Sequence, residues 1–292
     1  MGEPAVTQVP LESREMSDRD FIRFSGLIYE TCGIRLPPVK KTMLSARLAK
    51  RLRALRIPTF DKYYEYLTST RGWRDELHHM IDVVTTNKTG FFREPAHFEI
   101  LTQEVLPELL AARGKSGYSK LRFWSAACSS GEEPFTLAMV LEEFASKSPG
   151  GLSYEILATD ISIRMLQKAR AAVYEEEKVN AVPGHLRRKY LMRGRGAREG
   201  LVRIVPELRS NVQFERLNLL RTGGFGLKAL MDVVFCRNVV IYFNRKTQCE
   251  LFRRIYDQIQ PGGYLFIGHS ETLHGIHDGF RSVRATVYQK PR

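Results

Sequence analysis

The sequence of 292 residues has few cysteines and no long apolar run. It contains four cysteines, Cys32, Cys128, Cys236 and Cys249, and no C-x-x-C pair. This scatter argues against a zinc site and against a disulfide framework, and it favours a reducing compartment. No segment approaches about eighteen consecutive apolar residues, so we expect neither a membrane span nor direct insertion into a membrane. Residues 1–16 are polar and lack an apolar core, which predicts a disordered tail and not a signal peptide.

The sequence also lacks the G-x-G-x-x-G fingerprint that a nucleotide-binding sheet carries after its first strand. Residues 121–141 read as a strand, a tight turn and a helix, with Pro134 suited to the first helical turn. The turn has a single glycine, Gly131, followed by Glu132 and Glu133. Carboxylates at a helix N-terminus repel phosphate, so we expect a ligand with a positive group and no phosphate. In the alternative interpretation both glutamates only complement the helix dipole, which leaves the missing glycines unexplained.

Positive charge exceeds negative charge in this chain. The 45 lysines and arginines against 32 acidic residues give a net charge of +13. This balance is compatible with a nucleic-acid partner, with an acidic protein surface, and with charge that only keeps the chain soluble. Charge alone does not decide among the three.

The two halves of the chain have different hydrophobic patterns. Residues 17–84 show helical periodicity, with Ser17 as the expected N-cap of the first helix and Gly33 as its expected end. Within this half, residues 40–56 combine a leucine stripe with many lysines and arginines. From about residue 120, strand and helix patterns alternate. This alternation predicts an α/β domain with a doubly wound, mostly parallel sheet.

Residues 187–212 interrupt the alternation of strands and helices. Two short runs flank a glycine- and arginine-rich turn at residues 194–200, which predicts an inserted antiparallel hairpin. The glycines follow a strand but lead into another strand, whereas a dinucleotide fingerprint needs a helix there. We therefore interpret the segment as a hairpin loop.

Polar residues follow the ends of four predicted strands, and such ends meet at one edge of a parallel sheet. After the first strand comes the turn at 129–133; the second strand ends in Asp160, which can accept both hydroxyls of a ribose. The third ends in Asn218, suited to an adenine edge or a backbone contact, and the fourth in Arg237 and Asn238. Asp160 alone is equally suited to cap the next helix, but four polar strand ends together favour a nucleoside site. S-adenosylmethionine fits this site, because it joins a nucleoside to a sulfonium and an ammonium and has no phosphate.

Five long motifs resemble those of the chemotaxis receptor methyltransferases, the CheR family. The motifs are TTNKTGFFREPAHF (85–98), WSAACSSGEEP (124–134), ATDIS (158–162), FCRNVVIYF (235–243) and GGYLFIGHSE (262–271). The resemblance runs from about residue 17 to the C-terminus. One departure is the replacement of Ala-Ser-Thr-Gly by the residues 128–131, Cys-Ser-Ser-Gly. This change is conservative, and it makes Cys128 a small turn residue rather than a nucleophile.

The resemblance implies three parts: a helical N-terminal domain at 17–84, a linker and cofactor-contacting segment at 85–119, and a Rossmann-like methyltransferase domain at 120–292. The last part should contain a small antiparallel β subdomain at about 187–212. The resemblance also implies a cytoplasmic enzyme of chemotaxis signal transduction that uses S-adenosylmethionine to methylate glutamate side chains on chemoreceptor cytoplasmic helices. Its products are S-adenosylhomocysteine and glutamate methyl esters, which serve adaptation.

The site residues of the family carry over by motif. The resemblance implies these cofactor contacts: Asn87, Thr89, Arg93, Glu132, Asp160, Asn218, Leu219, Arg237 and Asn238. Arg93 and Tyr242 should lie nearest the transferred methyl group and are the candidate catalytic residues; the alternative for Tyr242 is a structural aromatic at a strand end. A glutamate carboxylate is already ionised at neutral pH, so the reaction requires no general base, and we expect no metal ligands.

The resemblance implies a protein partner, the methylation region of a chemoreceptor, which is a helical bundle rich in acidic residues. The basic helix at 40–56 is a candidate docking surface, with a solvated face as the alternative. The β subdomain is a candidate for a short peptide at a receptor's C-terminus, with a surface loop without a partner as the alternative. One rival hypothesis is a nucleic-acid methyltransferase, but the N-P-P-Y-type motif is absent after the fourth strand, and we expect no nucleic-acid partner. The other rival is a non-catalytic module that binds the cofactor or a receptor.

Overall fold

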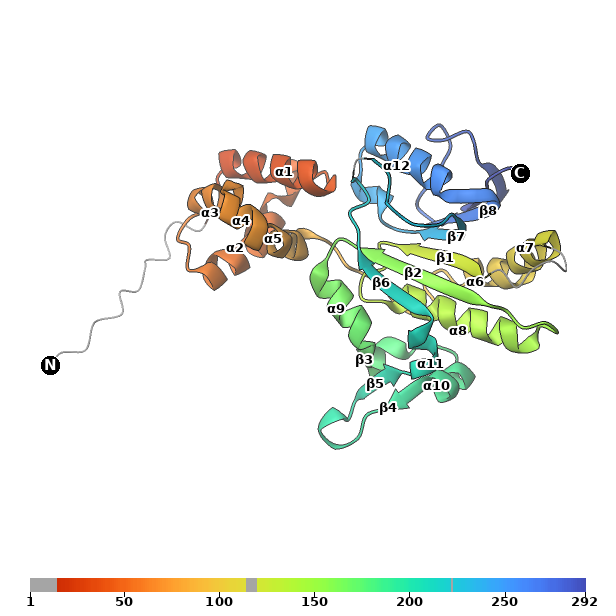
Figure 1. The fold of residues 1–292 in the computed structure, drawn as a ribbon. Coiled ribbons are helices and arrows are strands. Elements are labelled where there is room, and N and C mark those ends of the chain that lie inside the picture. The colour runs from red at the N-terminus through yellow and green to blue at the C-terminus, as the bar shows by residue number, and fades with distance from the viewer. Residues whose placement is uncertain (1–14, 114–119, 222) are drawn as a thin grey trace. The chain divides into compact units, whose positions relative to one another are not determined.

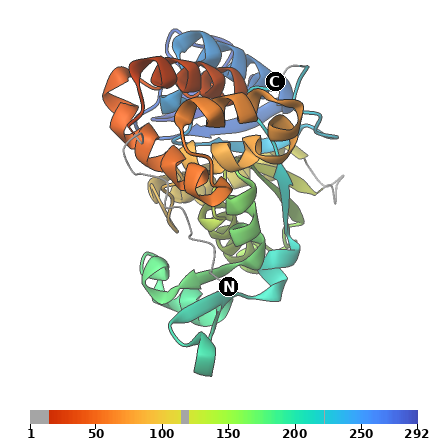
Figure 2. The ribbon, with the colours of Figure 1, turned by 90° about the vertical axis from the view of Figure 1, so that its left-hand side faces the viewer.

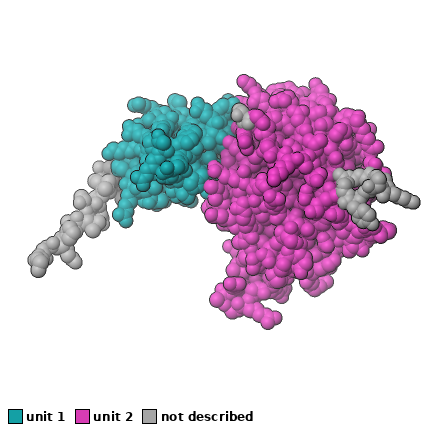
Figure 3. Space-filling view, viewed as in Figure 1, with its two compact units in different colours: residues 1–86 teal, residues 87–292 magenta. Residues whose placement is uncertain are grey.

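The computed structural model describes residues 15–113, 120–221 and 223–292. The chain divides into two compact units, Met1–Thr86 and Asn87–Arg292, which Figure 3 colours separately. The tail expected at 1–16 lies outside the described residues, except for its last two. None of the described helices is long and apolar enough to cross a membrane.

The first unit is built from helices, as its periodicity predicts. Its elements are α1 (Asp18–Cys32), η2 (Pro38–Lys40), α2 (Lys41–Leu55), α3 (Phe60–Thr68), α4 (Thr70–Asp75) and α5 (Leu77–Val84) (Figure 1). Ser17 caps α1 through a capping box, and Gly33 ends this helix in the left-handed region with φ of 69°. The predicted stripe of α2 is buried at Leu44, Leu48 and Leu52. The charged residues of α2 therefore surround an apolar side that belongs to the core of this unit.

The second unit contains a seven-stranded sheet in the order β6-β2-β1-β7-β8-β10-β9. Its strands are β1 (Leu121–Ala126), β2 (Tyr154–Asp160), β6 (Val212–Arg216), β7 (Met231–Cys236), β8 (Ile259–Ile267), β9 (Arg281–Arg284) and β10 (Val287–Gln289). The strands from β6 to β8 pair in parallel, and β10 runs antiparallel to both β8 and β9. The predicted α/β class with a mostly parallel sheet is confirmed. The sequence gives no signal for β9, because this strand is mostly exposed and lacks an apolar pattern.

Helices cover both faces of the seven-stranded sheet. They include α8 (Glu132–Lys147), α9 (Ile163–Ala171), α12 (Arg245–Gln258), and, from the linker segment, α6 (Ala96–Ile100), the π-helical η3 (Leu101–Val105) and α7 (Leu106–Arg113). Neighbouring residues of β1 point to opposite faces: Phe123 packs in one core cluster with Phe135 of α8, and Trp124 packs in another with Phe252 of α12. Figure 1 shows α8 and α12 on the two sides of the sheet. Both faces are therefore dry, and polar groups are left to the strand ends.

The inserted subdomain is a three-stranded antiparallel sheet in the order β3-β5-β4. Its elements are β3 (Val173–Glu175), η5 (Glu176–Val179), α10 (Gly184–Tyr190), β4 (Leu191–Arg193), η6 (Gly196–Arg198), β5 (Leu201–Ile204) and α11 (Pro206–Ser210). The predicted hairpin is confirmed, because β4 and β5 pair in antiparallel register. The sheet begins at β3, which pairs in antiparallel register with β5. Figures 1 and 2 show this small sheet projecting away from the larger one.

Candidate cofactor and active site

The ends of three parallel strands meet at one edge of the large sheet. Ala126, the last residue of β1, lies between Thr159 of β2 and Cys236 of β7. The strand order reverses at β1, and open α/β sheets bind their ligands at such a point, beyond the carboxyl ends of the strands. The polar residues that follow β1, β2 and β7 are therefore neighbours at the position where a ligand is expected.

The turn after β1 has a strained backbone, and close packing explains why its one glycine is needed. Ala127 and Ser129 have φ angles of 62° and 50°, and Gly131 has φ of 96°. A Cβ atom on Gly131 would lie 2.9 Å from both the Cβ of Ala169 and the hydroxyl of Tyr174. This glycine therefore allows α9 and β3 to approach the turn, which is a packing role and differs from that of a phosphate loop.

Asp160 joins the turn after β1 to the start of α9. Its carboxylate accepts the N–H groups of Ser129 and Ser162, both at 2.8 Å, and the residue is buried. The N-cap of α9 is Ser162, whose hydroxyl accepts the N–H of Met165. The alternative expectation, that Asp160 is itself the cap, is therefore wrong. Asp160 stands at the strand end with its carboxylate fixed by two backbone groups.

The two glutamates at the start of α8 have different surroundings. The carboxylate of Glu133 accepts Ser125 Oγ and Arg237 Nε, both at 2.7 Å, so its charge is neutralised within the protein. Glu132 is 2% exposed and accepts the Ser130 hydroxyl at 3.0 Å to Oε1 and at 2.7 Å to Oε2. Burial raises the pKa of Glu132, and the hydrogen bond from Ser130 opposes that rise. Within the described part of the chain, no lysine, arginine or histidine forms an ion pair with Glu132.

Arg237, at the end of β7, is the centre of a buried network. In addition to Glu133, its guanidinium donates to the carbonyl of Arg93 and to Nδ1 of His97, both at 2.9 Å, and it contacts Glu94 at 3.3 Å. Its side chain is only 2% exposed. Arg237 thus fastens the linker segment to the strand ends, and its side-chain donors are directed at protein groups.

The partners of His97 determine its tautomer. Arginine can only donate, so Nδ1 of His97 is the acceptor, and its Nε2–H donates to the hydroxyl of Thr286 at 2.8 Å. Burial lowers the pKa of His97 to about 4, and the positive charge of Arg237 adds to this effect. The ring is therefore neutral at physiological pH. Sequence reasoning missed both His97 and Glu94, although they lie in the motif at 85–98, because their partners Arg237 and Asn238 lie 140 and 144 positions away in the chain.

The loop after β7 is held by two carboxylates. Asn238 has φ of 58°; its side-chain amide donates to Glu94 Oε1 at 3.1 Å, and its N–H donates to Glu271 Oε2 at 3.0 Å. The following 3₁₀ turn, η7 (Val240–Tyr242), ends in the half-buried Tyr242. Glu271 belongs to the GHSE sequence (268–271) after β8.

The remaining predicted residues lie on the linker and after β6. The Ser129 hydroxyl donates to the carbonyl of Asn87 at 3.2 Å, which joins the linker to the turn. Arg93 is half-buried and donates to the carbonyl of Lys88 at 2.9 Å. Thr89 follows Lys88 in the chain. After β6, Asn218 Oδ1 accepts the N–H of Leu220 at 2.9 Å, and Leu219 is buried in the same cluster as Trp124.

The cysteine in the turn is not a nucleophile in this structure. Cys128 is 1% exposed, and burial, together with the negative charge of Asp160, raises the pKa of its thiol well above the usual range. A thiol in that state is inert. This agrees with its interpretation as a small turn residue.

The described residues suit S-adenosylmethionine. Glu132 is a buried carboxylate that forms no ion pair with a described residue, and a cationic ligand would compensate its charge. The head of α8 has two carboxylates, a poor place for phosphate. The structure and this donor set define an S-adenosylmethionine-dependent methyltransferase of the α/β class.

Comparison with known proteins identifies the family. Residues 87–289 match the model of the CheR methyltransferase, SAM binding domain, and residues 19–85 match that of the CheR methyltransferase, all-alpha domain. The chain belongs to the CheR methyltransferase family. It is 40% identical to the chemotaxis protein methyltransferase of Escherichia coli (strain K12) over 98% of this chain and 96% of that protein. It is 37% identical to that of Salmonella typhimurium (strain LT2) over 98% and 95%.

Among solved structures, the chain is similar to the glycopeptide N-methyltransferase MtfA complexed with S-adenosylmethionine. The TM-score is 0.31 at 14% identity, covering 57% of this chain and 53% of that one. This likeness is too low to add to the assignment, which the family models and relatives carry.

Proposed function

We propose that this protein methylates glutamate side chains on the cytoplasmic helices of chemoreceptors, forming glutamate methyl esters and S-adenosylhomocysteine. Full-length similarity to chemotaxis protein methyltransferases supports the reaction. The observation in this structure that supports the cofactor is Glu132, a buried carboxylate at the strand ends that forms no ion pair with a described residue. Because the methylation helices of receptors lie inside the cell, we place the protein in the cytoplasm.

We assign the cofactor contacts as the motifs suggest. Asp160 would accept the ribose hydroxyls at its carboxylate, which the N–H groups of Ser129 and Ser162 hold at the end of the strand. Glu132 would face the positive end of the cofactor. Arg237 would contribute through its backbone, because Nε and Nη1 of its guanidinium donate to protein groups. The other assigned contacts are Asn87, Thr89, Arg93, Asn218, Leu219 and Asn238.

When bound, S-adenosylmethionine supplies an electrophilic methyl group on a sulfonium. The receptor carboxylate oxygen bonds to that carbon while the carbon–sulfur bond breaks and its electron pair stays on sulfur, so no proton moves and no base is needed. The task of the protein is alignment and exclusion of water. We assign orientation of the acceptor carboxylate to Arg93, through its planar guanidinium, and to Tyr242, through its hydroxyl.

In the structure of the first unit, four of the seven cations on the basic helix (residues 40–56) remain as the candidate docking surface. Three of its cations have partners inside the unit: Lys41 pairs with Asp18, Arg47 donates to the carbonyls of residues 84 and 85, and Arg51 pairs with Glu76. Four other cations are exposed and form no ion pair with any described residue: Lys40, Lys50, Arg53 and Arg56. We infer that these four attract the acidic methylation region.

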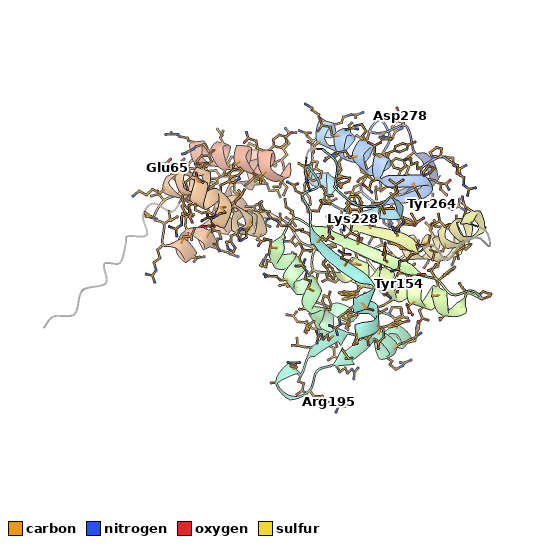
Figure 4. The ribbon with its side chains drawn as sticks, in the orientation of Figure 1. Glu65, Tyr154, Arg195, Lys228, Tyr264 and Asp278 are labelled. Atoms are coloured by element: carbon orange, nitrogen blue, oxygen red, sulfur yellow. The ribbon has the colours of Figure 1, made fainter. Side chains whose placement is uncertain are left out.

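We also propose that the β subdomain holds a receptor's C-terminal peptide. Both β3 and β4 are edges of its sheet, and an extended peptide can add to such an edge. Arg195 stands at the loop that joins β4 to β5, at the tip of the subdomain (Figure 4). Its charge, with that of Arg198, favours an acidic peptide.

One assay tests the reaction against its rivals. The full-length protein is incubated with methyl-tritiated S-adenosylmethionine and either purified receptor cytoplasmic fragments or bulk RNA, and the products are treated with mild alkali. We expect label in the receptor that alkali releases as volatile methanol, since only a carboxyl methyl ester behaves so. Alkali-stable label, label in RNA alone, or no transfer at all would each contradict the proposal.

A further inference from the structure

Glu271 is a buried carboxylate that is not among the assigned cofactor or acceptor contacts. It is 7% exposed and lies after β8, in a loop that its own N–H closes onto the carbonyl of Gly268 at 2.9 Å. Burial raises its pKa, while hydrogen bonds from backbone N–H groups oppose that rise. Glu271 forms no ion pair with a described cation. Its negative charge is therefore stabilised by backbone N–H donors.

The donors to Glu271 come from two loops. Its Oε2 accepts the N–H of Gly268 at 2.6 Å and that of Asn238 at 3.0 Å, and its Oε1 accepts the N–H of Val240 at 3.1 Å. Asn238 and Val240 flank the bend that leads from β7 into η7. The carboxylate therefore clamps this bend onto the loop after β8.

The clamp leaves little room for the bend to shift. A Cβ atom on Gly268 would lie 2.4 Å from the side-chain nitrogen of Asn238, and 2.9 Å from both its backbone nitrogen and Oε2 of Glu271. Asn238 is also held from the other side, where Glu94 accepts its amide. Val240 is 2% exposed, so its side chain anchors the first residue of η7 while Tyr242 ends the same turn.

We infer that Glu271 is a positioning residue of the methyl transfer: it fixes the bend at Asn238 and Val240 and so sets where Tyr242 presents its hydroxyl. This inference rests on the proposed function, in which Tyr242 orients the acceptor carboxylate. A glutamate is suited to the task because one carboxylate accepts several N–H groups at once, whereas an amide offers a single acceptor oxygen. Displacing a reacting group by about 1 Å can cost about 100-fold in rate.

The geometric part is tested without any assay of activity. Hydrogen exchange of the full-length protein is compared between wild type and Glu271→Gln. We expect the amides of Asn238 and Val240 to lose protection while amides in β1 and β2 keep theirs. Unchanged protection at both positions would overturn the clamp, whatever reaction the protein catalyses.

The catalytic part is tested by a double-mutant cycle with saturating S-adenosylmethionine and receptor. We expect Glu271→Gln and Tyr242→Phe each to lower kcat by about 10- to 100-fold, and the double variant to be no slower than Tyr242→Phe within about twofold. Effects that multiply would show that Glu271 acts elsewhere, and a wild-type rate for Tyr242→Phe would remove the residue through which it is said to act. Either result overturns the inference.

Two variants control for general damage. Glu108→Gln removes another hydrogen-bonded carboxylate of the same unit, one that accepts the Tyr264 hydroxyl at 2.5 Å and the Gln289 amide at 2.8 Å. It should lower Tm without lowering kcat, and an equal loss of kcat would mark the Glu271 effect as nonspecific. Gly268→Ala leaves Glu271 in the sequence but places a methyl group against both Asn238 and the Glu271 carboxylate, and it should reproduce the loss of kcat. If no variant or wild-type protein methylates receptors, the proposed reaction fails, and hydrogen exchange alone still decides the clamp.

Discussion

The guanidinium of Arg51 and the buried carboxylate of Glu76 form a bidentate pair, with two N–O distances of 2.7 Å. Glu76 is 2% exposed and also accepts the hydroxyl of Tyr63 at 2.8 Å. Removal of one partner leaves a buried charge, so Arg51→Met should destabilise the first unit by about 3 kcal/mol. Hydrogen exchange of amides in α2 and α5 would measure this loss. The exposed neighbour Arg53 is the control: Arg53→Met should change the same amides by less than about 0.5 kcal/mol.

Reversing the exposed cations of the basic helix should weaken receptor binding alone. We expect Lys50→Glu, Arg53→Glu and Arg56→Glu together to raise the apparent KM for receptor by about tenfold or more, and to leave the affinity for S-adenosylmethionine unchanged. The wild-type rate at limiting receptor should fall as salt rises, because exposed charges act over roughly 8–10 Å at ionic strengths of 0.1–0.15 M. Steady-state kinetics at several salt concentrations measure both effects.

A charge-matched control separates docking from net charge. Lys147, Lys228 and Lys246 are exposed residues of the second unit without ion pairs among the described residues, and Figure 4 labels Lys228. Reversing these three to glutamate should leave the KM for receptor near the wild-type value. Equal effects from the two triple variants would show that only the overall charge matters.

The sequence predicts the fold better than the hydrogen bonds and ion pairs of the site. Hydrophobic periodicity locates β1 and α8, because burial on both faces of the sheet gives them long apolar runs. Capping residues locate the helix that begins after Ser17. Asp160 and Glu132 are found as polar residues at strand ends. The roles of Arg237, Glu94 and Glu271 depend on partners far away in the chain. Arg237 contacts Arg93 and Glu94 across 144 and 143 positions, and Glu271 contacts Asn238 across 33 positions. No local sequence pattern encodes such contacts. The short edge strands β3 and β9 are not predicted for a related reason: they pair because of the strands beside them and not because of a pattern in their own residues.

Asp160→Ala should weaken cofactor binding through two losses. The ribose hydroxyls lose an acceptor, and the N–H of Ser129 loses the carboxylate that fixes the turn. We expect the affinity for S-adenosylmethionine, measured by calorimetry, to fall by about 1–3 kcal/mol. Ser162→Ala removes the N-cap of α9 and should cost about 1 kcal/mol of stability with little effect on affinity. Unchanged affinity in a folded Asp160→Ala variant would defeat the ribose assignment.

The stability of the second unit should fall in mild acid because of His97. Its pKa of about 4 in the folded protein lies below the usual value of 6.5, so in the window between them the unfolded chain binds more protons. The stabilisation is complete above pH 6.5 and is lost as the pH falls toward 4. Between pH 7 and pH 4.5 the difference in unfolding free energy between wild type and His97→Asn should shrink by about 2–3 kcal/mol. Urea unfolding followed by the fluorescence of the buried Trp124, in a Trp73→Phe background, measures it.

An exposed histidine serves as the control for this pH dependence. His274 lies on the surface of the same unit, and His274→Gln should leave the loss of stability between pH 7 and pH 4.5 unchanged. A constant difference between wild type and His97→Asn over that range would show that His97 is not the responsible group.

Glu132→Gln should reveal which positive group of the cofactor meets the buried carboxylate. S-adenosylmethionine has a sulfonium that S-adenosylhomocysteine lacks, whereas both carry the ammonium. If Glu132 faces the sulfonium, Glu132→Gln should weaken S-adenosylmethionine by about tenfold more than S-adenosylhomocysteine; if it faces the ammonium, both should weaken equally. Calorimetry with both ligands gives the two ratios. Glu133→Gln is the matched control: its carboxylate pairs with Arg237, so it should lower stability and leave the ratio of the two affinities unaltered. Unchanged binding of both ligands to Glu132→Gln would remove this residue from the cofactor site.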